Sequence, residues 1–249
     1  MRYFDCHVHL ASPDDAGFTK FVTYVRQRPD LVGCNLVLNT ADEISVVARR
    51  RDELPANVVV IPPVPLELEV PAPLAASSWW KIHPTLHAIT RARIPAVVEK
   101  LRQVGAAGFM VHHFPWGDRL EHNTGLELVI ELARAFPELP IVATHGGGYE
   151  SWHLRAHTAR LGNVYYDFSI TFATFAGTDF LRPWVQYVQK RRNRILFGSD
   201  WPSAEAEPQL ESAIRLAAEG GLASDALGMQ LLENSKRLWS SVKGGELLR

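Results

Sequence analysis

The chain has 249 residues and a formal net charge of −1; 47% of the residues are hydrophobic and 21% are charged. This is the balance of a soluble domain with a large core, and it carries no electrostatic signature of binding to nucleic acid or to an anionic membrane surface. Pro and Glu interrupt the longest apolar stretch, so we expect no transmembrane span. The N-terminus has no signal-peptide core, and Cys6 and Cys34 lie in apolar runs typical of buried thiols. We therefore expect a cytoplasmic protein.

Short apolar runs alternate with amphipathic stretches from one end of the chain to the other. Eight of these runs are rich in Val, Ile, Leu and Phe and carry few charges, as parallel strands covered by helices do. The predicted strands are Arg2–His9, Gly33–Asn39, Asn57–Val64, Trp79–His83, Gly108–His112, Pro140–His145, Asn163–Ser169 and Arg194–Asp200. The predicted helices, with apolar residues three and four apart, are Phe18–Arg28, Asp42–Arg51, Pro95–Val104, Gly125–Phe136, Glu150–Leu161, Thr178–Lys190, Pro208–Glu219 and Ser224–Ser240.

The connection between the third and fourth predicted strands is different. Pro65 to Ser78 contain three prolines and no helical period, so we expect an irregular segment with at most a short helical turn. The rest of the chain alternates β and α without a break in composition, which predicts a single domain over residues 1–249. Eight parallel strands in this length favour an α/β fold of the (β/α)8 TIM-barrel type over an open doubly wound sheet.

Titratable side chains stand at the ends of several predicted strands. His7 and His9 end the first strand, and residues two apart on a strand share a face, so both imidazoles can bind one ion. Because the carboxyl ends of barrel strands meet at one mouth, the mixture of imidazole and carboxylate there predicts a divalent metal site. The other strand-end groups are Lys81 and His83 on the fourth strand, His112 and His113 on the fifth, His145 on the sixth and Asp200 on the eighth.

Three segments, DCHVHL at the start, VATHGGG in the sixth strand and FGSDWP in the eighth, resemble the amidohydrolase superfamily. The likeness is greatest to the amidohydrolase-related branch that includes aminocarboxymuconate semialdehyde decarboxylase, resorcylate decarboxylase and pyrone dicarboxylate lactonase. The run Leu232 to Trp239 also resembles the C-terminal motif of that branch. The resemblance spans nearly the whole chain, and it implies a metal-dependent enzyme built on a TIM barrel.

The resemblance also implies residue roles. His7 and His9 would bind the metal, with a fifth-strand histidine as third ligand, His112 in preference to His113. Asp200 would bind the metal and act as general base on the bound water, and His145 would either bind a second metal or polarise the substrate. In binuclear relatives a lysine at the position of Lys81 is carbamylated and bridges two metals, but a lysine is also common there in relatives with a single metal. We expect one divalent ion, zinc, with manganese as the alternative.

Other residues near the strand ends are candidates for contact with the substrate. Aromatic rings there can line an apolar pocket, and arginines such as Arg91 can clamp a carboxylate. Asp5 would either orient an imidazole from behind or be a hydrogen-bonded acid of the core. The three glycines after His145 allow either close approach of substrate or simply the geometry of the loop. The substrate-contacting set that we predict is His83, Trp116, Arg119 and Trp201.

Hydrolysis of a small carbonyl compound, an amide, lactone or ester, by metal-activated water is the function that these features favour. The alternative is a non-oxidative decarboxylase or hydratase, a lyase that acts on a small carboxylated substrate with the same metal site. A barrel that binds without turnover is disfavoured, because Asp200 is present as a base. The expected partner is a small-molecule substrate, and we expect binding to neither nucleic acid nor a membrane. A homodimer is a possible state of assembly.

Overall fold

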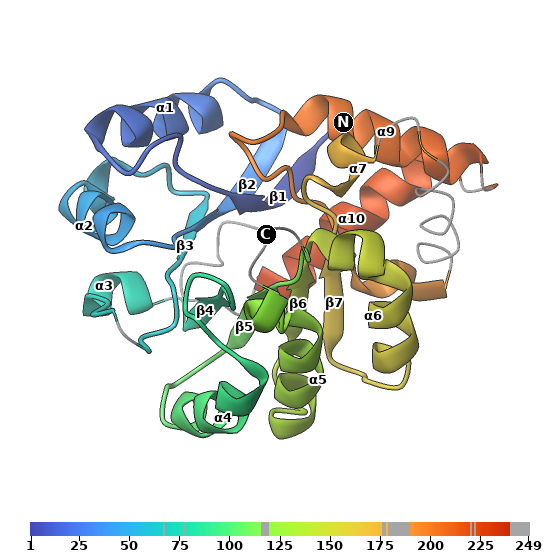
Figure 1. Cartoon of the computed structure of the whole chain (residues 1–249). Coiled ribbons are helices and arrows are strands. Elements are labelled where there is room, and N and C mark those ends of the chain that lie inside the picture. Colours follow the sequence, from blue (N-terminus) through green and yellow to red (C-terminus); the bar gives the residue numbers. More distant parts are fainter. Residues whose placement is uncertain are drawn as a thin grey trace.

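The computed structural model describes residues 1–66, 68–76, 78–115, 120–175, 178, 190–219, 221 and 223–239. Its strands are β1 (Tyr3–Val8), β2 (Leu31–Val37), β3 (Val58–Ile61), β4 (Trp79–Ile82), β5 (Gly108–His112), β6 (Ile141–Thr144), β7 (Val164–Asp167) and β8 (Ile195–Leu196). The helices are α1 (Asp15–Arg26), α2 (Ala41–Arg49), α3 (Ala72–Ala75), α4 (Ile94–Arg102), α5 (Gly125–Ala135), α6 (Ser151–Thr158), α7 (Thr171–Thr174), α9 (Ala206–Glu219) and α10 (Ser224–Trp239). The helices surround a ring of strands (Figure 1).

The strands pair in parallel in two sheets, β1-β2-β3 and β4-β5-β6-β7-β8. Two short seams join these sheets into a closed barrel. At one seam the backbone N–H of Lys81 donates to the carbonyl of Pro62 over 2.8 Å, and Val64 donates back to Lys81 over 2.8 Å. At the other seam Val8 forms a parallel bridge with Trp201, just after β8. Closure brings the carboxyl ends of β1 and β8 side by side.

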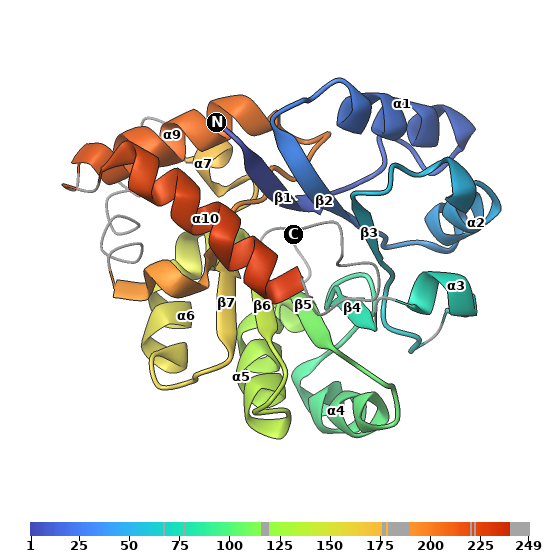
Figure 2. The ribbon, with the colours of Figure 1, turned by 180° about the vertical axis from the view of Figure 1, so that it is seen from behind.

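Two apolar clusters fill the molecule. The larger one lies between the strands and the surrounding helices, and the smaller one holds side chains of the barrel interior. Helix α10 crosses one end of the barrel (Figure 2) and adds Trp239 to the smaller cluster. The indole of Trp239 packs edge-on against Trp79, with ring centroids 4.1 Å apart. A side chain at Gly108 would overlap the Trp79 ring, since its Cβ would lie 2.5 Å away. Glycine at the start of β5 therefore makes room for the packing of Trp79 against Trp239.

The described residues confirm the predicted fold class. All eight strands form where the apolar runs indicated, although the ladders of β3, β6, β7 and β8 are shorter than the predicted segments. After β6, β7 and β8 the chain leaves the ladder, and His145, Ser169 and Asp200 follow there. Between β3 and β4 the chain forms only the four-residue helix α3, as its prolines suggested. Most of the predicted helix 178–190 lies outside the described residues. No helix among the described residues is both long and apolar enough to cross a membrane.

Candidate metal centre

Three potential ligands meet where β1 and β8 end side by side. Along this seam the backbone N–H of Asp200 donates to the carbonyl of His7 over 2.8 Å, and that of His9 donates to Trp201 over 2.7 Å. The Oδ1 atom of Asp200 consequently lies 3.6 Å from Nε2 of His7 and 3.4 Å from Nε2 of His9. One ligand atom from each of these three residues lies within 4.8 Å of the other two.

The remaining ring nitrogens of the two histidines are held by acceptors. Nδ1 of His7 lies 2.7 Å from Oδ2 of Asp167, and Nδ1 of His9 lies 2.9 Å from the carbonyl oxygen of Val37. A carbonyl accepts and a carboxylate accepts, so each ring carries its proton on Nδ1 and presents a bare Nε2 towards Asp200. Two imidazole nitrogens and one carboxylate oxygen form a donor set that suits a zinc-like divalent cation.

Asp167, at the end of β7, belongs to this site, and the sequence analysis missed it. Its carboxylate also accepts from the backbone N–H of Ser169 over 2.8 Å and from the Ser169 hydroxyl over 2.9 Å. A side chain at Gly198 would exclude it, because a Cβ there would lie 2.5 Å from Oδ1 of Asp167. A signal was present: Asp167 and Ser169 stand two apart at a strand end, as His7 and His9 do.

Asp5 does not orient an imidazole. Its Oδ1 accepts from the backbone N–H groups of His7 and Ser199, over 3.2 and 2.9 Å, and its Oδ2 accepts from the hydroxyl of Tyr24 on α1 over 3.3 Å. The pairing of β1 with β2 shifts register between Asp5 and Val8, and the simple alternation from Asp5 to His7 does not survive this shift. Burial raises the pKa of Asp5 to about 7. It is the hydrogen-bonded core acid of the two expected alternatives.

Lys81 brings an ammonium group to the edge of the ligand set. Its side chain is buried, and Nζ lies 3.4 Å from Nε2 of His7 and 3.3 Å from Oγ1 of Thr144. Burial lowers the pKa of Lys81 to about 8, although the carboxylate of Asp200 acts in the opposite direction. Because an ammonium group only donates, its approach again requires that Nε2 of His7 carry no proton.

The charge of Asp200 is stabilised by its neighbours. Burial alone would raise the pKa of this carboxyl, but its interactions with the neighbouring imidazoles of His9, His145 and His7 hold the pKa well below its usual range. The backbone of Asp200 adopts a φ of 65°, in the left-handed region that non-glycine residues seldom occupy. Such a conformation in a buried turn is typical of functional sites.

A cavity of about 240 Å³ opens beside these ligands. The rings of His83 and His112 stack on its wall with centroids 3.8 Å apart, and Nε2 of His145 lies 3.1 Å from Nδ1 of His112. His112 therefore shares the cavity with the ligand set, although its nitrogens are not part of the group of three within 4.8 Å. The cavity is lined by His9, Asn39, Lys81, His83, His112, Phe114, His145, Ile170, Asp200 and Ser203.

Other predicted residues lie elsewhere. His113 is buried behind the cavity wall, where its ring lies against Gly147, and burial lowers the pKa of His113 to about 3. The Trp201 indole is not part of the lining and stacks on Tyr24 of α1, with ring centroids 4.4 Å apart. The remaining substrate-contact candidates, Trp116 and Arg119, lie outside the described residues.

The three glycines after His145 allow the backbone conformation of the loop that follows β6. Gly146, Gly147 and Gly148 all have positive φ, between 50° and 83°, and a Cβ at Gly148 would lie 2.8 Å from the ring of Phe114. None of the three lines the cavity. Loop geometry, and not close approach of a substrate, accounts for them.

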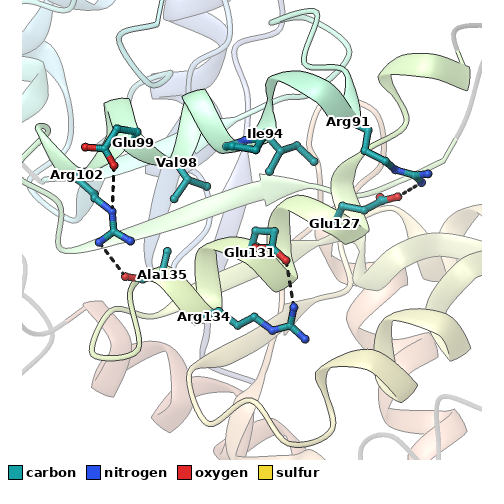
Figure 3. A pocket seen from close by; sticks show the side chains of 10 residues that line it. Arg91, Ile94, Val98, Glu99, Arg102, Glu127, Glu131, Arg134 and Ala135 are labelled. Atoms are coloured by element: carbon teal, nitrogen blue, oxygen red, sulfur yellow. Dashed lines mark hydrogen bonds and ion pairs between the residues drawn. The ribbon is translucent and has the colours of Figure 1, made fainter.

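A larger hollow, about 560 Å³, lies on the outer flank between α4 and α5 (Figure 3). Its charges pair with one another: Arg91 with Glu127, Arg134 with Glu131 at 3.1 Å, and Arg102 with Glu99 at 3.5 Å. Arg91 thus faces the helices and does not contribute to the mouth. With no metal-binding cluster among its described residues, this groove does not compete with the cavity as the candidate site.

A family model for amidohydrolases matches residues 73–240, more than half of the chain, and this match includes Asp200. The chain belongs to the amidohydrolase family. No curated protein matches this family member. The family is thus established from the larger part of the barrel.

Solved structures resemble the fold of this family member at low identity. A TatD homologue of Escherichia coli is 12% identical with a TM-score of 0.56, over 95% of this chain and 97% of the other. A probable 2-pyrone-4,6-dicarboxylic acid hydrolase of Acinetobacter baumannii, crystallised with citric acid, is 14% identical with a TM-score of 0.55, over 96% and 100%. A second such probable hydrolase, from Pseudomonas putida, is 15% identical with a TM-score of 0.54, over 96% and 97%.

Proposed function

We propose that this protein is a metal-dependent hydrolase that cleaves a small carbonyl compound, such as a lactone, an ester or an amide, with water as nucleophile. The observation that carries the proposal is the convergence of two bare Nε2 atoms, from His7 and His9, on Oδ1 of Asp200. Membership of the amidohydrolase family supports it. We propose one divalent ion per chain, zinc in preference to manganese.

His7, His9 and Asp200 would hold the ion, with His112 from the cavity wall as the proposed third imidazole. A divalent cation bound there would lower the pKa of water from about 15.7 towards 7 and so supply a nucleophile near neutral pH. The proposed role of Asp200 is that of the general base, because its carboxylate is ionised and lies in the ligand set, where it would adjoin a water bound to the ion. His145, on the same wall, is the proposed contact of the reacting carbonyl group.

The cavity limits the substrate. A volume of about 240 Å³ lies below the roughly 300–1,000 Å³ that is usual for sites of drug-sized ligands, so it suits a compact molecule. Phe114 and Ile170 supply apolar surface beside the histidines. Two of the similar solved structures carry the name of a pyrone dicarboxylic acid hydrolase, so lactones come first among the compounds to test.

The decisive experiment measures metal and turnover together. We expect close to one zinc or manganese ion per chain after purification without chelators, and hydrolysis of at least one lactone, ester or amide that removal of the ion abolishes. An absence of stoichiometric metal would contradict the metal site. Two ions per chain would revive Lys81 as a carbamate bridge. Carbon dioxide released from carboxylated aromatics, with no hydrolysis, would replace the hydrolase by the lyase.

A further inference from the structure

Four polar side chains form a continuous hydrogen-bonded chain from β7 to the cavity wall. The hydroxyl of Ser169 donates to Oδ2 of Asp167 over 2.9 Å, and the same oxygen lies 2.9 Å from Nδ1 of His145. On the other side of that ring, Nε2 of His145 lies 3.1 Å from Nδ1 of His112. Ser169 and Asp167 are fully buried, and His145 is nearly so. The part of this series from Asp167 to Ser169 is therefore shielded from water, and its other end, at His112, lines the cavity.

The positions of the protons follow from which groups can only accept. Asp167 receives hydrogen bonds from His7 and from both the backbone N–H and the hydroxyl of Ser169, so its carboxylate acts as acceptor throughout. The single hydroxyl proton of Ser169 points to Asp167, which leaves its oxygen as an acceptor for Nδ1 of His145. The backbone carbonyl of Ser169 lies 3.2 Å from the same nitrogen and can likewise only accept. His145 must therefore carry its proton on Nδ1.

The same reasoning places the protons on the next ring of the hydrogen-bonded series. With one proton on the ring, Nε2 of His145 is bare and accepts from His112, whose own proton must then sit on Nδ1. We propose that Ser169 is a positioning residue whose hydroxyl connects Asp167 to His145 and thereby sets the proton arrangement of both His145 and His112. In this arrangement His7, His9 and His112 each present an unprotonated Nε2.

This arrangement restricts what His145 can do, an implication that rests on the proposed function. A bare Nε2 accepts hydrogen bonds and cannot donate one to a carbonyl oxygen. His145 can polarise a substrate through Nε2 only after that nitrogen has gained a proton, so it begins the reaction as an acceptor. The tautomers themselves do not depend on any catalytic role.

Nitrogen-15 NMR of the full chain, labelled at the histidine rings and loaded with zinc, tests the proposal without an activity assay. We expect a protonated Nδ1 and an unprotonated Nε2 for both His145 and His112, with the signals assigned through His145→Gln and His112→Gln. In Ser169→Ala, His145 loses one of its two acceptors at Nδ1, so both rings should shift together towards the form protonated on Nε2. Ser169→Cys, which keeps the volume but offers a weak acceptor, should shift them in the same direction.

Ser235→Ala is the matched control, because Ser235 is an equally buried serine whose hydroxyl donates within α10, to the carbonyl of Leu231 over 3.0 Å. It should leave both rings unchanged. A wild-type His145 protonated on Nε2, or on both nitrogens, would overturn the proposal. So would Ser169 variants that fold and leave the spectra of both rings unaltered. Hydrolysis of no tested substrate, with the expected spectra, would instead count only against the proposed function.

Discussion

Oδ2 of Asp167 lies 2.7 Å from Nδ1 of His7, and both side chains are fully buried. The two residues stand 160 positions apart in the chain, and only closure of the barrel brings β7 behind the ligand on β1. A carboxylate behind a ligating histidine fixes the tautomer and the orientation of the ring and increases the basicity of its other nitrogen. The contact predicts that Asp167 supports metal binding at this site through His7.

Replacement of Asp167 by Asn should weaken metal binding by about 10–100-fold. The amide keeps the volume but loses the charge, and its NH2 group can donate to Nδ1 and so place the His7 proton on Nε2. Competition for zinc against a chromophoric chelator measures the change. Asp30→Asn, at an exposed carboxylate that pairs with the N-terminus, is the control and should not alter the affinity. An unchanged affinity in Asp167→Asn would contradict the role of Asp167 as the support of a metal-binding His7.

His7→Ala and His9→Ala should each lose the metal, whereas Asp200→Asn should retain much of it and still be inactive. The difference follows from the proposed roles, since imidazoles supply most of the affinity and the carboxylate also accepts the proton. Elemental analysis and turnover of the same preparations separate the two effects. Full activity in Asp200→Asn would refute its assignment as the base.

The fifth-strand histidines should differ in what their removal costs. His112 lines the cavity, so His112→Ala should abolish metal binding, whereas His113→Ala should leave it nearly intact. His113 is buried against Gly147, so its truncation should instead lower the free energy of unfolding by about 1–3 kcal/mol. Metal content and urea unfolding of both variants provide the readouts. Loss of metal only in His113→Ala would reverse the assignment.

The stability of the protein should depend strongly on the packing of α10 against one end of the barrel. Trp239 is fully buried against Trp79 and Phe4, and Trp239→Ala should lower the free energy of unfolding by about 3–5 kcal/mol through lost burial and the cavity that remains. Met229→Ala, at a 64% exposed position of the same helix, should change it by less than about 0.5 kcal/mol. Equal effects of Trp239→Ala and Met229→Ala in urea unfolding would contradict the role of Trp239 in the packing of the barrel interior.

Local patterns in the sequence determined the barrel and the first part of its candidate site. Apolar runs flanked by helical periods identify the strands, because burial between two layers demands such residues whatever the neighbouring strand is. His7, His9 and Asp200 could be singled out since catalytic groups of barrels sit at strand ends, and strand ends are visible in the sequence. The resemblance to the amidohydrolase family favoured His112 over His113 at the end of β5, and His112 is the one that lines the cavity.

Only the tertiary structure decided which groups support those residues. Asp167 reaches His7 because parallel strands close into a ring, a long-range relationship that no local period encodes. Asp5 faces α1 instead of an imidazole because β1 shifts register against β2, and Trp201 stacks on Tyr24 because the chain turns after Asp200. Hydrogen-bond partners depend on distances between segments far apart in the sequence. The candidate ligands could therefore be predicted from the sequence, whereas the position of the proton on each histidine ring depends on the fold.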